Sequence, residues 1–122
     1  MLHKIDFEEE HVAGFRWEGK FDEKAFKQSL VQFLPELERR SKLNIYAEVV
    51  DLTEVEAKAL WEGIKFDIKN FNRILKKIDK VAYVTDIGWM RTMAEGIYSI
   101  IPGVKFKAFE FKEAEAAKTW IK

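Results

Sequence analysis

The stretch that decides the fold is Lys80-Val81-Ala82-Tyr83-Val84-Thr85-Asp86-Ile87-Gly88-Trp89-Met90. A short run of apolar and β-branched residues ends in a polar pair, and an amphipathic segment follows directly. This pattern is typical of a buried parallel strand, here 81–85, that leads into a helix. Ligands of open α/β sheets bind beyond the carboxyl ends of such strands, so the pattern also indicates where a site would lie.

The rest of the chain predicts four more strands and several helices around this one. Alternating apolar and polar residues predict strands over 2–8, 12–18 and 43–51, and a last strand over 104–109. The polar turn at 8–11 predicts that the first two strands form an antiparallel hairpin. Apolar residues at spacings of three and four predict helices over 22–40, 53–78, 89–101 and 113–122, and Asn70 and Asn72 could break the second of these and leave a short further helix before strand 81–85. Pro35 interrupts the first helix, and Thr53 with Glu56 forms a capping-box pattern at the start of the second.

The element order is therefore ββαβαβαβα, which predicts an α/β fold. We expect a mixed, mostly parallel five-stranded sheet with an N-terminal hairpin, covered by about four helices. The length of 122 residues fits a single domain over 1–122.

Composition excludes several classes of function. The chain has no Cys, which excludes disulfides, thiolate catalysis and zinc–thiolate sites. Basic and acidic residues balance at 21 each, so no strong field favours nucleic acid or an anionic membrane. No apolar run approaches the roughly 20 residues that span a bilayer, and the N-terminus lacks the apolar core of a signal peptide. We therefore expect a cytoplasmic protein that is not transmembrane and does not bind nucleic acid.

Three motifs in order carry a resemblance to a known family. They are Ala59-Leu60-Trp61-Glu62-Gly63-Ile64-Lys65-Phe66-Asp67, then the strand 80–86 followed by Trp89, then Ala117-Lys118-Thr119-Trp120-Ile121. Together they resemble the SpoIIAA-like family of STAS/SEC14-type domains over nearly the whole chain. The resemblance implies a small α/β sandwich. It also implies relatives that bind proteins, as anti-sigma-factor antagonists do, or lipids, as SEC14-like domains do.

One departure from the regulatory antagonists concerns their phosphorylation switch. The resemblance implies a phosphorylatable Ser at the start of the helix after the third strand, and the matching stretch here is Glu56-Ala57-Lys58-Ala59-Leu60-Trp61, without a hydroxyl. A phosphate switch adds up to two negative charges at a helix N-terminus, which this stretch cannot accept. Thr53 lies nearby, and we interpret it as a helix cap.

Aromatic and thioether side chains gather on the two helical segments that flank strand 81–85. They could line an apolar pocket for an acyl chain or a partner helix, or they could fill the core. Trp61 and Trp89 lie near helix starts, where rings often reach the surface, and are the preferred lining residues. The candidate ligand-binding residues are Trp61, Phe66, Trp89, Met90, Met93 and Asp86.

Charged residues offer weaker candidates. Asp51 and Asp86 follow parallel strands, where they could act as acid and base or cap helices; capping is the favoured interpretation. His3 and His11 could hold a metal across the hairpin, but half-buried strand histidines are commoner. Cations at 73, 76, 77 and 80 form a basic patch that could bind a lipid headgroup or remain a solvated face. We predict no catalytic residue, no metal and no cofactor.

Three functional hypotheses remain. The first is a non-enzymatic binding module for a small apolar ligand or lipid. The second is a protein-interaction or regulatory module, related to anti-sigma-factor antagonists but lacking the phosphorylatable Ser, which could act as a homodimer. The third, a hydrolase or isomerase using Asp51 and Asp86, ranks last because no nucleophile or cofactor motif accompanies them.

Overall fold

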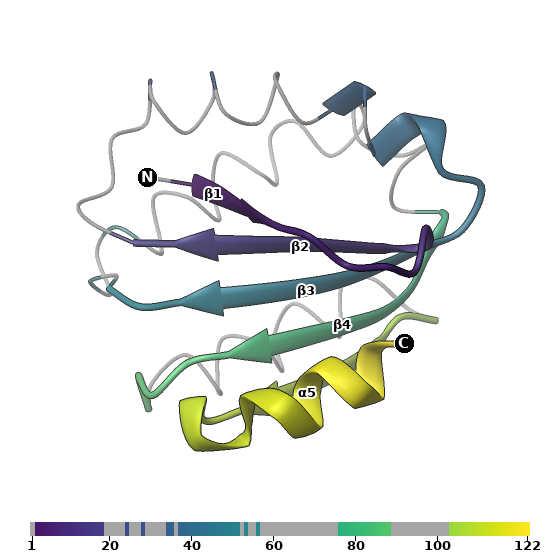
Figure 1. The fold of residues 1–122 in the computed structure, drawn as a ribbon. Coiled ribbons are helices and arrows are strands. Elements are labelled where there is room, and N and C mark those ends of the chain that lie inside the picture. Colours follow the sequence, from purple (N-terminus) through teal and green to yellow (C-terminus); the bar gives the residue numbers. More distant parts are fainter. Residues whose placement is uncertain are drawn as a thin grey trace.

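The computed structural model describes residues 2–18, 24, 28, 34–35, 37–51, 53, 56, 76–88 and 103–122. The described elements are five strands, a 3-10 helix and a C-terminal α-helix (Figure 1). Their bounds are β1 (Leu2–Ile5), β2 (Val12–Trp17), β3 (Leu43–Val49), β4 (Ile78–Val84), β5 (Lys105–Phe109), η1 (Phe111–Glu113) and α5 (Ala114–Ile121).

The strands form one sheet in the order β1-β2-β3-β4-β5. β1 pairs antiparallel with β2, and every other neighbouring pair is parallel. α5 runs alongside β4, roughly along the direction of the strands (Figure 1), and packs against β3 and β4. The prediction of a mixed, mostly parallel five-stranded sheet with an N-terminal hairpin is therefore confirmed.

The expected helices over 22–40, 53–78 and 89–101 lie largely outside the described residues, and with them the count of four helices. Within those ranges, the described residues 24, 28, 34–35, 37–39 and 56 are helical. Among the helices of the described residues, none is long and apolar enough to cross a membrane.

Some element bounds differ from the sequence-based expectation. β4 begins at Ile78, three residues before the predicted strand, and Ile78 pairs with Leu43. Sequence spacing assigned Ile78 to a helix because it lies at a three-residue interval from Leu75; that assignment was wrong. β1 is also shorter than expected and ends at Ile5. The final helix is preceded by the short turn η1.

Each face of the sheet carries its own hydrophobic cluster. On the α5 face, a cluster forms around Tyr46 and Val84 of the sheet and around Ala117 and Ile121 of α5. On the opposite face, Ala13 and Leu43 pack with Leu37 of the helical segment before β3. Side chains alternate between faces along each strand, so both faces of the central strand β3 are buried.

A large aromatic side chain at the centre of the sheet is accommodated by small neighbours. Tyr46 is fully buried and lies in register with Gly14 on β2 and Ala82 on β4. The ring of Phe7, from the turn after β1, packs edge-on against Tyr46 with ring centroids 5.2 Å apart. Phe7 reaches this position by lying over Gly14, where a Cβ would approach both Cε2 of Phe7 and the Ile5 carbonyl to 2.6 Å. Glycine at position 14 thus lets the turn fold back over the sheet.

Replacing this glycine tests the close approach. In Gly14→Ala the new methyl group must displace the Phe7 ring or the β1 backbone, and we expect the free energy of unfolding to fall by about 1–3 kcal/mol. Gly88→Ala is the matched control, since an added Cβ there meets no atom of the described residues within 4 Å. Urea denaturation measures both variants; equal stability of the two would contradict the packing.

Candidate functional site

The carboxyl end of β4 was the expected location of a site. Thr85 is buried, and its Oγ1 accepts the N–H of Ile87 at 3.2 Å. Asp86 is exposed, and its Oδ1 accepts the N–H of Phe111 at 3.0 Å. The carboxylate therefore accepts a hydrogen bond from the first residue of η1, the short helix that follows β5. A negative charge is favoured at the start of a helix because the N–H groups there have no partner within the helix. The carboxylate thus lies at the start of η1, while capping of the expected helix 89–101 by Asp86 stays a prediction because that helix lies outside the described residues.

The predicted capping box after β3 is confirmed. The N–H of Thr53 donates to Oε2 of Glu56 at 3.0 Å, and the N–H of Glu56 donates to Oγ1 of Thr53 at 3.2 Å. The Thr53 hydroxyl is thus engaged as a helix cap, which supports the structural interpretation of this residue over a role in a phosphate switch.

The aromatic and thioether candidates Trp61, Phe66, Trp89, Met90 and Met93 lie outside the described residues. Their lining role therefore stays a prediction.

Two described members of the predicted basic patch, Lys77 and Lys80, contact different parts of the structure. Lys77 Nζ donates to the Glu38 carbonyl at 2.7 Å. Lys80 Nζ lies 3.4 Å from the Trp120 carbonyl and 5.4 Å from the centroid of the Trp120 ring. Each lysine is tied to a different element, because Lys80 lies on the α5 face of β4 and Lys77 precedes the strand.

The two histidines of the hairpin also have separate environments. His3 Nε2 lies 3.5 Å from Oε1 of Glu18, whereas His11 Nε2 lies 2.8 Å from the carbonyl oxygen of Lys122. The side chains do not converge, and no group of three metal-ligating side chains occurs within the described part of the chain.

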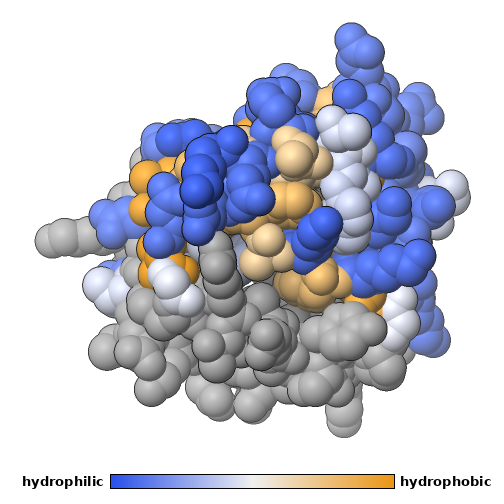
Figure 2. Space-filling view, turned by 90° about the horizontal axis from the view of Figure 1, so that it is seen from below, coloured by the Kyte–Doolittle hydropathy of each residue, from blue (hydrophilic) through white to orange (hydrophobic). Residues whose placement is uncertain are grey.

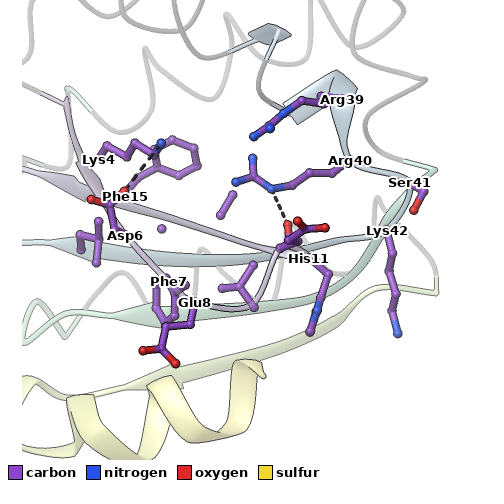
Figure 3. A pocket seen from close by; sticks show the side chains of 15 residues that line it. Lys4, Asp6, Phe7, Glu8, His11, Phe15, Arg39, Arg40, Ser41 and Lys42 are labelled. Carbon is purple, nitrogen blue, oxygen red and sulfur yellow. Dashed lines mark hydrogen bonds and ion pairs between the residues drawn. The ribbon is translucent and has the colours of Figure 1, made fainter.

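The described residues enclose a cleft beside the N-terminal hairpin that sequence reasoning missed (Figure 3). It has a volume of about 590 Å³ and lies between the hairpin and the segment that leads into β3. Its lining consists of Lys4, Ile5, Asp6, Phe7, Glu8, Glu10, His11, Val12, Ala13, Gly14, Phe15, Arg39, Arg40, Ser41 and Lys42. A cleft of this size falls within the usual range of small-ligand sites. Two sequence features could have indicated this cleft, namely the apolar alternation of the hairpin and the Arg39-Arg40 pair. Arg39 follows Phe15 of the hairpin by 24 residues, so only the fold brings the two features together.

Two neighbouring features position the walls of the cleft. Leu37 is buried against Ala13 and Leu43, which fixes the two arginines that follow it. Arg40 Nε donates to the carbonyl oxygen of Glu10 at 2.6 Å and so joins this segment to the turn of the hairpin.

A charged network occupies the α5 face next to the hairpin. Arg16 donates to Oε2 of Glu18 at 3.1 Å and to Oε1 of Glu48 at 3.2 Å. The hydroxyl of Tyr46 donates to Oε2 of Glu48 at 3.1 Å. The hydrogen bond to Glu18 is the main cause that raises the pKa of Arg16. Burial, with a further contribution from the Glu48 carboxylate, raises the pKa of Tyr46 far above its ordinary value. The buried Glu48 carboxylate is therefore held by a guanidinium and a phenol.

The network predicts how stability responds to alkaline pH. Tyr46→Phe removes a hydrogen bond to a charged group, so we expect the free energy of unfolding to fall by about 1.5–3 kcal/mol at pH 7. Above pH about 10 the tyrosine ionises in the unfolded chain but not in the folded one, so the wild type loses about 1.4 kcal/mol per pH unit that the variant does not. The stability gap therefore narrows as pH rises.

Tyr83→Phe is the control for this prediction. Burial is the cause that raises the pKa of Tyr83, whereas the pKa of Tyr46 is also raised by its contact with Glu48. This variant should match the wild type at pH 7 within about 1 kcal/mol and exceed it above pH 10. Urea denaturation at pH 7 to 11 measures both, and parallel curves for wild type and Tyr46→Phe would contradict the buried phenol.

Comparisons with known proteins place the chain in a family. The model of the SpoIIAA-like family matches residues 12–122, from β2 to the end of α5. Neither the curated proteins nor the solved structures give a significant match. Since the matched region spans most of the sheet as well as the C-terminal helix, the chain belongs to the SpoIIAA-like family.

Proposed function

We propose that this SpoIIAA-like domain is a non-enzymatic binding module for a small ligand with an apolar body, such as a lipid. The observation that carries the proposal is the cleft of about 590 Å³ beside the hairpin. Among its apolar lining residues, Ala13 and Phe15 lie on the face of the sheet that Leu37 covers, whereas Ile5, Phe7 and Val12 pack into the cluster on the α5 face. Binding pockets for small molecules combine such apolar walls with a few polar groups that set orientation.

Of the two carboxylates that the hydrolase or isomerase hypothesis named, Asp86 has a structural partner, and the buried Glu48 carboxylate is engaged as well. Asp86 accepts a backbone N–H of η1, and Glu48 lies between Arg16 and the phenol of Tyr46. A general base must reach a substrate proton, and groups engaged in this way are poorly suited to that task. These contacts favour binding over catalysis.

The alternative, a protein-interaction module, receives less support from the described residues. A docking surface on a monomer usually exposes a contiguous apolar patch of several hundred Å². Val50, at 39%, is the exposed large hydrophobic side chain among the described residues. On the face drawn in Figure 2, the described residues are mostly hydrophilic, and apolar side chains form a narrow band between them.

Native mass spectrometry of the purified protein tests the proposal. We expect adducts of lipid mass that disappear on denaturation, and a saturable change in tryptophan fluorescence on titration with octanoate. Bare protein without any titratable response would refute ligand binding.

Tryptophan variants report where the ligand lies. Binding in the cleft, whose lining contains no tryptophan, should leave the response of Trp61→Phe and Trp89→Phe unchanged, whereas a response lost in these variants would place the ligand in the sequence-predicted pocket around the two rings. Trp120→Phe is the matched control, because this ring packs against Phe109 with centroids 6.1 Å apart and lies under Lys80. A response that depends only on Trp120 would contradict the predicted pocket.

A further inference from the structure

The cleft beside the hairpin has two sides of different polarity. The hairpin contributes aromatic and aliphatic side chains, among them Phe15, which pairs in register with Lys4 across β1 and β2. The opposite wall contributes the consecutive residues Arg39 and Arg40. In Figure 3 both guanidinium groups extend from their segment toward the hairpin, and the ammonium group of Lys4 lies beside the Phe15 ring on the facing side. Three cationic ends thus surround one region of the cleft.

The arginine pair is held in place by the fold. Leu37 is 7% exposed and anchors the end of the helical segment against the sheet. The hydrogen bond of 2.6 Å from Arg40 Nε to the Glu10 carbonyl fixes one guanidinium at the mouth of the cleft. Holding a guanidinium before a ligand arrives reduces the entropy lost on binding.

Acidic side chains also line the cleft, and their positions matter. Asp6 lies 3.7 Å from Lys4 Nζ, as an ion pair between two partly exposed side chains. The Glu8 carboxylate points away from the arginines (Figure 3). Glu10 faces solvent and contributes its backbone carbonyl to Arg40. The arginine side of the cleft is consequently the side suited to an anion.

We propose that the cleft binds a small amphipathic anion, with a carboxylate or phosphate head group between Arg39 and Arg40 and an apolar body against Phe15. Guanidinium groups form paired, charge-assisted hydrogen bonds with such head groups. Ala13 lies next to Phe15 on this face of the sheet and extends the apolar side of the cleft. This inference rests on the proposed binding function and adds to it the location of the ligand and the charge of its head group.

Isothermal titration calorimetry with octanoate, octyl phosphate and 1-octanol tests the inference. The three probes share one apolar chain, so the first two distinguish a carboxylate from a phosphate head group, and the third removes the charge. We expect at least one anion to bind about tenfold or more tightly than 1-octanol, and its affinity to fall with added salt. Equal binding of anion and alcohol would overturn the inference while leaving the proposed function intact.

Variants of the exposed Arg39 localise the effect. Arg39→Gln should weaken anion binding about tenfold, and Arg39→Lys should weaken it less, because the charge remains but the paired geometry is lost. Lys42→Gln is the matched control, since Lys42 also lines the cleft but its Nζ lies 3.9 Å from Asp79 and its chain points away from the arginines (Figure 3). Thermal unfolding verifies that each variant is folded.

Amide chemical shifts provide a second measurement that does not depend on a substitution. Octanoate or octyl phosphate should shift the amides of Ala13, Phe15 and Arg40 in a saturable manner. Saturable binding that leaves these amides and the Arg39→Gln affinity unchanged would overturn the location, and the proposed function would stand. Absence of binding by all three probes, together with bare protein in native mass spectrometry, would refute both.

Discussion

The architecture depends on a buried tyrosine between two small residues at the middle of the sheet. Tyr46 fits on the central strand because its in-register neighbours are Gly14 and Ala82, which leave room for its ring. The absent side chain at Gly14 also admits Phe7, whose ring contacts Tyr46 edge to face at a favourable separation. The same packing therefore holds the core and the position of the hairpin turn. Because that turn forms one wall of the cleft, the position of this wall depends on the close approach of Phe7 to Gly14, which also lines the cleft.

The sheet could be predicted from the sequence because strand periodicity is strong in this chain. The alternation around Phe15 and Ile45 and the apolar run ending at Thr85 predicted the correct strands, and the order of elements predicted their parallel pairing. The start of β4 was not predictable, because Ile78 fits a helical spacing and a strand equally well. Tertiary pairing with Leu43 decided between them, and no local pattern carries that information.

The candidate site was less accessible to sequence reasoning than the fold. Helix capping by Thr53 and Glu56 was predictable, since the two residues are close in sequence and a known motif joins them. The cleft depends on Arg39 and Arg40 meeting a hairpin that ends more than 20 residues earlier, which only the folded chain brings together. Likewise, sequence adjacency suggested that Asp86 serves the segment directly after β4, whereas its carboxylate contacts Phe111.

Three side chains in or next to separate strands form hydrogen bonds with the carbonyl oxygens of the last three residues of the chain, at the end of α5. The buried amide of Asn44 donates to Ile121 at 2.7 Å, Lys80 reaches Trp120, and the ring of His11 contacts Lys122. Those partners are separated by between 40 and 111 residues along the chain. Such nonlocal contacts form only after long loops have closed, which costs entropy before any contact is gained. We therefore expect α5 to dock late in folding, after the strands of the sheet have paired.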